Sequence, residues 1–220
     1  MAIGTLPNRS IGHGRHAGHD GRGAGAGGDH PSGDTPGGAI VPPRAYVTGI
    51  TVALGAVLMF FMALVSAYIV RRDMPLSGWL PLAVFPRILW LDTLLLLASS
   101  FTLSRARRLL LAGRDSGFRF WWKITAGLGI AFLAGQLIAW RELAAAGVYL
   151  ATNPSSSFFF VFTATHGLHI LGGIAALLWV MFRRPRRLGL ATATEVAAIY
   201  WHFMDGIWLF LFSLLLFAKA

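Results

Sequence analysis

Five long apolar segments follow one another along the chain, separated by short stretches rich in arginine, glycine and proline. They cover residues 46–70, 87–104, 120–141, 158–182 and 195–218. A helix needs about 20 apolar residues to cross the hydrocarbon core of a bilayer, and irregular backbone cannot face lipid. The pattern therefore predicts an all-α fold, a polytopic membrane bundle of five transmembrane helices within a domain spanning residues 45–220.

Residues 1–44 differ from the rest because they contain no apolar run. They are rich in glycine and carry four histidines, His13, His16, His19 and His30. Segments of low hydrophobicity cannot form a packed core, so we expect a disordered Gly/His-rich tail. Weak metal binding by these histidines is the alternative. The first apolar run begins only near Tyr46, so a signal peptide is not expected.

Composition and charge narrow the class of protein and predict its orientation. The chain is 55% hydrophobic and only 13% charged, and it has no cysteine, which excludes disulfides and thiolate metal sites. Fourteen of its 19 lysines and arginines fall in the tail, around the connection after the second segment, and after the fourth segment. Basic residues accumulate on the cytoplasmic side of membrane proteins. The N-terminus, with its tail, is therefore predicted to be inside and the C-terminus outside.

Ionisable side chains within the last two apolar segments are the main candidates for a special role, because such groups are costly in lipid. His166 and His169 lie in the fourth segment, and His202 and Asp205 in the fifth, each pair three residues apart and so on one helix face. A helical rise of 1.5 Å per residue places His166 nearly level with Asp205. We expect these four residues and Glu195 to form a buried polar cluster, with a His166–Asp205 hydrogen bond. Glu195 is also expected to cap the start of the fifth helix.

Three functions are open for this cluster. It could hold the fourth and fifth helices together as a structural polar contact. Two histidines on facing helices could instead ligate a haem, which would make the chain a bis-histidine membrane electron carrier. A relay of protons through the histidines and the aspartate is the third.

The remaining polar and aromatic positions suggest packing, subunit or lipid contacts. Asp92 lies early in the second helix, where the helix dipole would stabilise its negative charge or where it could contact a partner subunit. Glu142 is expected to form an ion pair with Arg141 at the membrane interface. Candidates for helix packing or subunit contact are Asp92, Gln136, Trp140, Glu142, Trp201 and Trp208, and small residues that permit close packing are Ser99, Ser100, Gly172 and Gly173. Candidates for binding anionic lipid head groups are Arg183, Arg184, Arg186 and Arg187.

Several catalytic signatures are missing from the sequence. It has no phosphate-binding loop, no nucleophile elbow and no HExxH zinc motif. We therefore expect no catalytic centre in this chain, and no cofactor-binding or metal-binding residues are assigned.

Several motifs, in order along the chain, resemble subunit III of the haem-copper oxidases, the family that contains cytochrome c oxidase subunit III. They are Asp92-Thr93-Leu94-Leu95-Leu96 with Ser99-Ser100, then Gln136, Trp140 and Glu142, then Ser157-Phe158-Phe159 and Thr163-Ala164-Thr165-His166-Gly167-Leu168-His169, and finally Glu195, Tyr200-Trp201-His202-Phe203-Met204-Asp205 and Trp208-Leu209-Phe210. The resemblance covers residues 46–218 and fits the short, five-helix bacterial form.

The resemblance implies a non-catalytic subunit of a respiratory terminal oxidase in the bacterial plasma membrane, which supports oxygen reduction coupled to proton translocation in aerobic electron transport. It implies direct packing against subunit I, with subunit II, and a subunit IV where one is present, in the same complex. Haem and copper would be held by the partner subunits, and a lipid-filled cleft would hold structural phospholipid. Nucleic acid is not an expected partner.

Two departures from the family pattern bear on proton chemistry. Val57 and Ala139 occupy positions where relatives in this family carry glutamate. Neither side chain can titrate, which favours a structural role over a proton relay. An accessory subunit of a quinol oxidase or a nitric oxide reductase is the alternative within the family.

Overall fold

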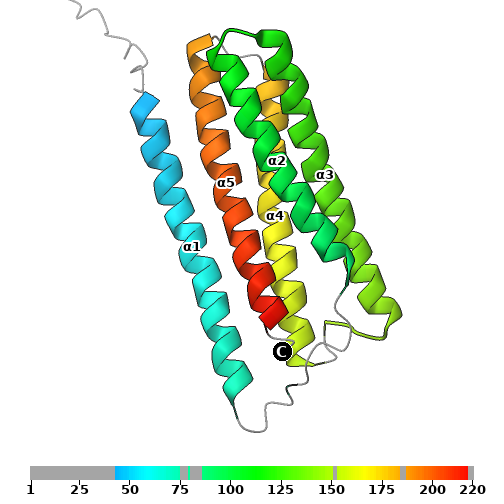
Figure 1. The fold of residues 1–220 in the computed structure, drawn as a ribbon. Helices are drawn as coiled ribbons and strands as arrows, with labels where there is room; N and C mark the ends of the chain where they lie inside the picture. The colour runs from blue at the N-terminus through cyan, green and yellow to red at the C-terminus, as the bar shows by residue number, and fades with distance from the viewer. Residues whose placement is uncertain (1–42, 75–78, 80–85, 151–152, 184–186, 218–220) are drawn as a thin grey trace, which may run out of the picture. The chain divides into compact units, whose positions relative to one another are not determined.

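A computed structural model of the chain describes residues 43–74, 79, 86–150, 153–183 and 187–217. Within these residues it has five α-helices: α1 (Pro43–Asp73), α2 (Ile88–Leu111), α3 (Asp115–Ala145), α4 (Pro154–Arg183) and α5 (Arg187–Phe217) (Figure 1). All five are long and apolar enough to cross a membrane. This confirms the predicted fold class. The tail predicted over residues 1–44 lies, except for its last two residues, outside the described part of the chain.

Each helix extends beyond the apolar segment that predicted it. The largest extensions are the end of α2, which continues from residue 104 to Leu111, and the start of α5, which lies at Arg187 rather than near residue 195. Arginine, leucine and alanine favour a helix and threonine tolerates one, and the single glycine in the α5 extension, Gly189, does not end it. Hydropathy therefore found the apolar part of each helix, and the helices continue into the polar flanks.

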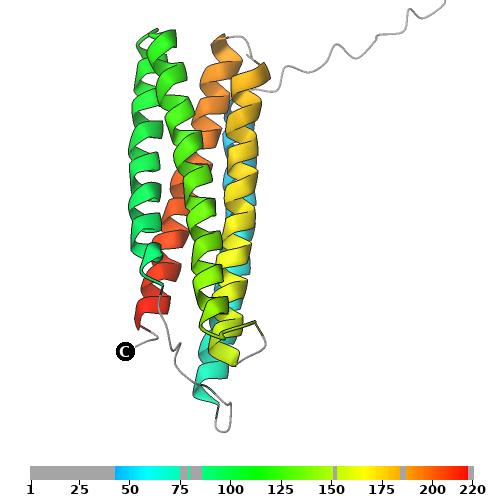
Figure 2. The same ribbon diagram turned by 90° about the vertical axis from the view of Figure 1, so that its right-hand side faces the viewer.

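Helices α2 to α5 form a four-helix bundle, and α1 lies on one side of it. Within the described residues, α2 packs against α3 and α5, α4 packs against α3 and α5, and α1 approaches only α4 and α5. The two views show α5 between α1 and α2 (Figures 1 and 2). Only 17% of the apolar window of α1 is buried, against 39–44% in the other four helices. The peripheral position of α1 therefore leaves most of its apolar surface available to lipid or to another chain.

Glycines end α2 and α3 with the same hydrogen-bond pattern. Gly113 and Gly147 have φ angles of 72° and 75°, a left-handed conformation that glycine adopts without steric cost. After α2, Gly113 N–H donates to Leu110 and Arg114 N–H to Leu109. The corresponding bonds follow α3. This Schellman arrangement satisfies the last carbonyl groups of each helix and turns the chain sharply.

Candidate functional site: polar contacts between the membrane helices

A buried contact between an acid and an amide joins α2 to α3. Asp92, in the second turn of α2, accepts a 2.8 Å hydrogen bond from Gln136 Nε2. Gly135 makes the close approach of the two helices possible, because a Cβ at this position would lie 2.6 Å from Asp92 Cγ and still nearer to its Oδ1. The Asp92 side chain therefore faces α3 and takes part in a helix–helix contact.

Four buried or partly buried tryptophans donate their indole N–H groups across helix interfaces. Trp201 and Trp208 of α5 donate to α2, at Ser99 Oγ (2.9 Å) and Thr93 Oγ1 (3.0 Å). Between α3 and α4, the indoles of Trp122 and Trp140 donate to the Leu177 carbonyl (2.9 Å) and to Thr163 Oγ1 (3.0 Å). Buried indole groups need such partners. These bonds fix the rotation of α5 against α2 and of α3 against α4.

Trp201 also depends on two glycines of neighbouring helices. A Cβ at Gly129 on α3 would lie 2.7 Å from the indole Cη2, and one at Gly173 on α4 would lie 3.1 Å from Cζ3. Larger residues at either position would displace the ring. The contact at Gly173 agrees with the sequence prediction that this glycine permits close packing.

His166 lies in an aromatic environment within the bundle. Its ring centroid is 5.7 Å from that of Phe132 on α3 and 5.1 Å from that of Trp208 on α5. Both ring nitrogens are buried, and neither forms a hydrogen bond with any described residue. The two carboxylate oxygens of Asp205 are also buried, and neither forms a hydrogen bond with any described residue. The predicted His166–Asp205 hydrogen bond is therefore wrong: equal depth in the membrane did not bring the two groups together.

The ring of His169 contacts α1. Its Nδ1 lies 2.8 Å from the Thr165 carbonyl one turn earlier in α4, and its ring centroid is 5.5 Å from that of Phe61 on α1. The backbone carbonyl of His169 accepts a 2.8 Å hydrogen bond from the Tyr200 hydroxyl. This residue therefore contributes to contacts of α4 with both α1 and α5.

His202 and Glu195 lie on an exposed face of the bundle, beside α2. His202 Nδ1 is 2.5 Å from Ser100 Oγ, and its Nε2 is 3.3 Å from Ser104 Oγ. Glu195 pairs with Arg107 of α2 at 3.2 Å, and both side chains are nearly half exposed. Glu195 does not cap α5, because the helix begins eight residues earlier, at Arg187.

The five residues predicted to form one polar cluster are divided between two groups: His202, Asp205 and Glu195 lie beside α2, with Ser100 next to both His202 and Asp205, whereas the rings of His166 and His169 contact Phe132 and Phe61. No described hydrogen bond, ion pair or ring contact joins any two of them. Haem ligation would require two histidine rings directed at a common cavity. The three histidine rings of the described helices have separate surroundings: His166 is enclosed by aromatic rings, His169 bonds its own helix and His202 is exposed. Within the described residues, no three His, Asp or Glu side chains are grouped closely enough to hold a metal ion.

The remaining predicted positions lie at the ends of helices. Glu142, near the end of α3, is exposed and does not form the predicted ion pair with Arg141. The proposed lipid-binding arginines lie where the structure describes no side chains: Arg184 and Arg186 fall outside the described residues, as do the side chains of Arg183 and Arg187.

Comparison with known proteins relates this arrangement to a family. The sequence model of the family described as cytochrome c oxidase subunit III matches residues 45–219, which include all five helices except the first two residues of α1. The chain belongs to this family. Its motifs with Asp92, His166 and His202, which carried the resemblance, all lie in the matched region.

Relatives in the cytochrome c oxidase subunit III family match most of the chain. The protein named probable cytochrome c oxidase subunit 3 of Mycobacterium tuberculosis (strain ATCC 25618 / H37Rv) is 32% identical over 184 residues, 80% of this chain and 90% of the relative. Cytochrome c oxidase subunit 3 of Thermostichus vulcanus is 35% identical over 179 residues, 79% of this chain and 87% of the relative. A protein named quinol oxidase subunit 3, from Bacillus spizizenii, is 31% identical over 175 residues, 77% of this chain and 85% of the relative.

Membership of the family gives the chain its cellular setting. It is a subunit III of a haem-copper oxidase of the respiratory chain, and so part of a complex with other oxidase subunits. Its five membrane-spanning helices and its bacterial relatives identify a multi-pass protein of the plasma membrane.

Several residues that hold the bundle together were not assigned to helix packing from the sequence. They are Trp122, Gly129, Gly135 and the buried pair Thr102 and Thr125, whose hydroxyl groups lie 2.8 Å apart. Small residues in membrane helices are a general signal for close packing. That signal alone cannot separate Gly129 and Gly135 from the exposed Gly127 on the same helix, where a Cβ would meet nothing within 4 Å.

Proposed function

We propose that this chain is a non-catalytic scaffold subunit that packs directly against subunit I and supports its reduction of oxygen and translocation of protons. The observation that carries this proposal is that several interior polar groups form hydrogen bonds between helices. Asp92 and Gln136 bond each other, and the Trp122, Trp140, Trp201 and Trp208 indoles bond neighbouring helices. Such bonds stabilise a membrane bundle and leave these groups occupied in packing.

A structural role also fits the two positions at which the family carries glutamate. Val57 is partly buried against the core, and Ala139 is fully buried. Neither side chain can carry a proton, so we propose that proton transfer takes place in the partner subunits, where haem and copper are held. His166, His169, His202, Asp205 and Glu195 are accordingly proposed to act in packing and assembly.

The orientation and lipid contacts belong to the same proposal. The N-terminus lies in the cytoplasm, as the distribution of basic residues indicates. The arginines of the α4–α5 connection then lie on the cytoplasmic side, where they bind phosphate groups of anionic phospholipids. Subunit II, and subunit IV where it is present, complete the complex.

Removal of this chain from its host tests the proposal. Oxidase isolated without it should retain the haem absorption bands and oxygen consumption of the partner subunits but be less stable during turnover. The chain purified alone should carry no stoichiometric haem, iron or copper. A haem Soret band from the isolated chain would refute the scaffold proposal in favour of an electron carrier.

The electron donor is proposed to be cytochrome c, as the names of the relatives from M. tuberculosis and T. vulcanus indicate for those proteins. The B. spizizenii relative favours quinol as a second candidate. Oxygen consumption by the purified complex, measured with reduced cytochrome c and separately with a quinol, distinguishes the two.

A further inference from the structure

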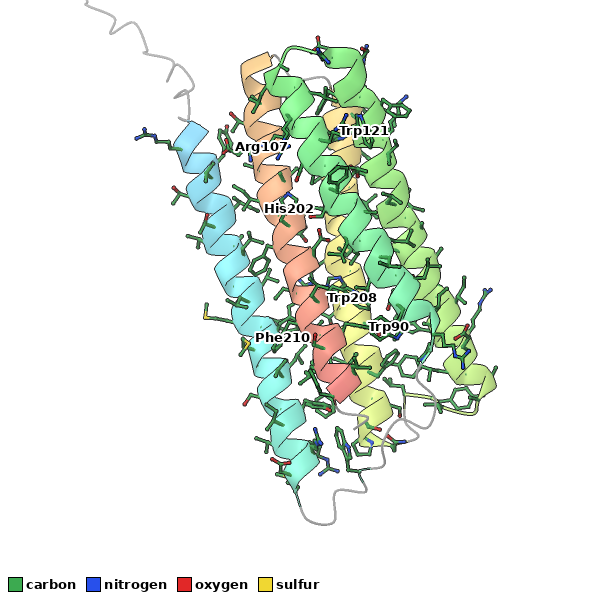
Figure 3. The ribbon with its side chains drawn as sticks, in the orientation of Figure 1. Trp90, Arg107, Trp121, His202, Trp208 and Phe210 are labelled. Carbon is green, nitrogen blue, oxygen red and sulfur yellow. The ribbon has the colours of Figure 1, made fainter. Side chains whose placement is uncertain are left out.

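A row of polar and small residues follows the outer junction of α2 and α5. We call it the α2–α5 seam and define it as Ser100, Ser104 and Arg107 of α2 with Glu195, His202 and Gly206 of α5. Figure 3 labels Arg107, from α2, and His202, from α5, near this junction. Within the described residues, α1 packs against α4 and α5 but not against α2, so it does not close the seam.

The centre of the seam lies within the apolar segments of both helices. At 1.5 Å per residue, His202 lies about 10 Å from the start of the segment 195–218, and Ser100 about 6 Å from the end of the segment 87–104. The imidazole of His202 is nevertheless exposed. Lipid head groups do not reach this depth, so acyl chains would face an imidazole and two hydroxyl groups if the seam were bare. Polar groups at such depth normally face other protein or a water-filled cavity.

Asp205 adds a second observation beside the seam. It lies one turn from His202 on α5 and is buried, and its carboxylate is close to the Ser100 hydroxyl. Neither carboxylate oxygen has a hydrogen bond of good geometry with a described residue. The polar groups at this level are therefore incompletely satisfied by the chain itself, and an unsatisfied polar group in a low-dielectric environment is costly.

We propose that the α2–α5 seam is the surface on which a transmembrane helix of another oxidase subunit docks. This inference rests on the proposed function, because it takes the chain to be an assembled scaffold. Arg107 and Glu195 neutralise each other, so the docking helix carries neutral hydrogen-bonding side chains at the level of His202 and Ser100. A Cβ at Gly206 would meet nothing within 4 Å, which leaves room for close approach of that helix.

Photo-crosslinking in the intact complex tests the inference. The photoreactive residue p-benzoylphenylalanine replaces Leu97, one turn before Ser100 on α2 and 45% exposed, in the tagged full-length chain in its own host. The same substitution at Leu168, 67% exposed on α4, measures the background. After irradiation of whole membranes, we expect the Leu97 variant to form an adduct with a transmembrane helix of another oxidase subunit.

The possible results separate this inference from the proposed function. If oxidase subunits co-purify with the tag but the Leu97 adducts contain only lipid, or only a second copy of this chain, the seam inference is wrong and the scaffold proposal stands. If no oxidase subunit co-purifies with the unmodified tagged chain, both are wrong.

A second experiment removes the polar groups of the seam. In the double variant Ser100→Ala, His202→Leu we expect the co-purified partner subunit to fall about tenfold relative to this chain, the effect of weakening association by about 1.4 kcal/mol. Thr51→Ala is the matched control, because Thr51 carries an exposed hydroxyl on α1 that donates a hydrogen bond to the Val47 carbonyl of the same helix. Unchanged recovery of the partner in the double variant would overturn the inference. If the double variant does not accumulate in the membrane, the crosslinking experiment alone decides whether the seam is the docking surface.

Discussion

Replacing Gly135 with alanine is expected to disrupt the contact between Asp92 and Gln136 and to destabilise the α2–α3 pair. The new Cβ would lie 2.6 Å from Asp92 Cγ, closer than side-chain carbons approach one another. Asp92 is fully buried between the helices, so its side chain cannot move into solvent. Either the carboxylate rotates away from Gln136 or the helices separate locally.

The expected loss of stability in Gly135→Ala combines two unfavourable effects and one favourable effect. Overpacking a buried site costs about 1–3 kcal/mol, and losing a polar contact between membrane helices costs about 0.6–2 kcal/mol. Alanine favours the helix over glycine by about 1 kcal/mol. The net destabilisation of Gly135→Ala is therefore expected to be about 1–4 kcal/mol.

The assay is reversible unfolding of the purified chain by SDS titration in mixed micelles, followed by near-UV circular dichroism. Gly127→Ala is the matched control, since it makes the same substitution in the same helix at a position where a Cβ meets nothing within 4 Å. It should leave stability unchanged or raise it slightly. Combining Gly135→Ala with Asp92→Ala should give less than the sum of the two single effects, because the second substitution removes the obstructing carboxylate. Equal stability of Gly135→Ala and Gly127→Ala would refute this account of the α2–α3 contact.

Three further predictions use the same unfolding assay. Trp201→Phe removes the hydrogen-bond donor to Ser99 while keeping an aromatic ring, and should lower the free energy of unfolding by about 1–2 kcal/mol. Its control, Trp179→Phe, changes an exposed residue and should change stability by less than about 0.5 kcal/mol. An equal effect at both positions would contradict the role assigned to the Ser99 bond. Thr102→Val should lower the free energy of unfolding by about 1 kcal/mol, because it leaves the buried Thr125 hydroxyl without its interhelical partner. A stability equal to that of the wild type would show that this pair of hydroxyl groups contributes nothing. His166→Phe should leave stability unchanged or raise it, since it removes two buried nitrogens that bond no described residue. The complex should continue to consume oxygen. Loss of this activity in a stable variant would indicate a chemical role for His166.

The number of helices and their membrane-spanning character could be predicted from the sequence because hydropathy is a property of each segment by itself. The ends of the helices could not, since Arg187 to Thr194 continue α5 although they lie outside its apolar segment. The family resemblance was also accessible, because its motifs are contiguous runs of residues.

The pairing of polar groups could not be derived in the same way. Depth along the membrane placed His166 level with Asp205, but the hydrogen-bonding partners of a helix face depend on its rotation, which a single sequence does not give. Large aromatic residues set that rotation here: Trp201 fits between Gly129 and Gly173, and Trp208 lies beside His166. The residues Asp92, Gln136 and Trp140 were identified as packing candidates, but their individual partners required the structure.

The tryptophans at the two extremes of burial give the chain fluorophores in two different environments. Trp122, Trp201 and Trp208 are almost completely covered by protein, whereas Trp90 and Trp179 are about half exposed. Brominated acyl chains in a reconstituted bilayer should therefore quench emission from the second group and spare the first. Loosening of the bundle would make the spared emission quenchable, so the unlabelled protein carries an optical reporter of its own helix packing.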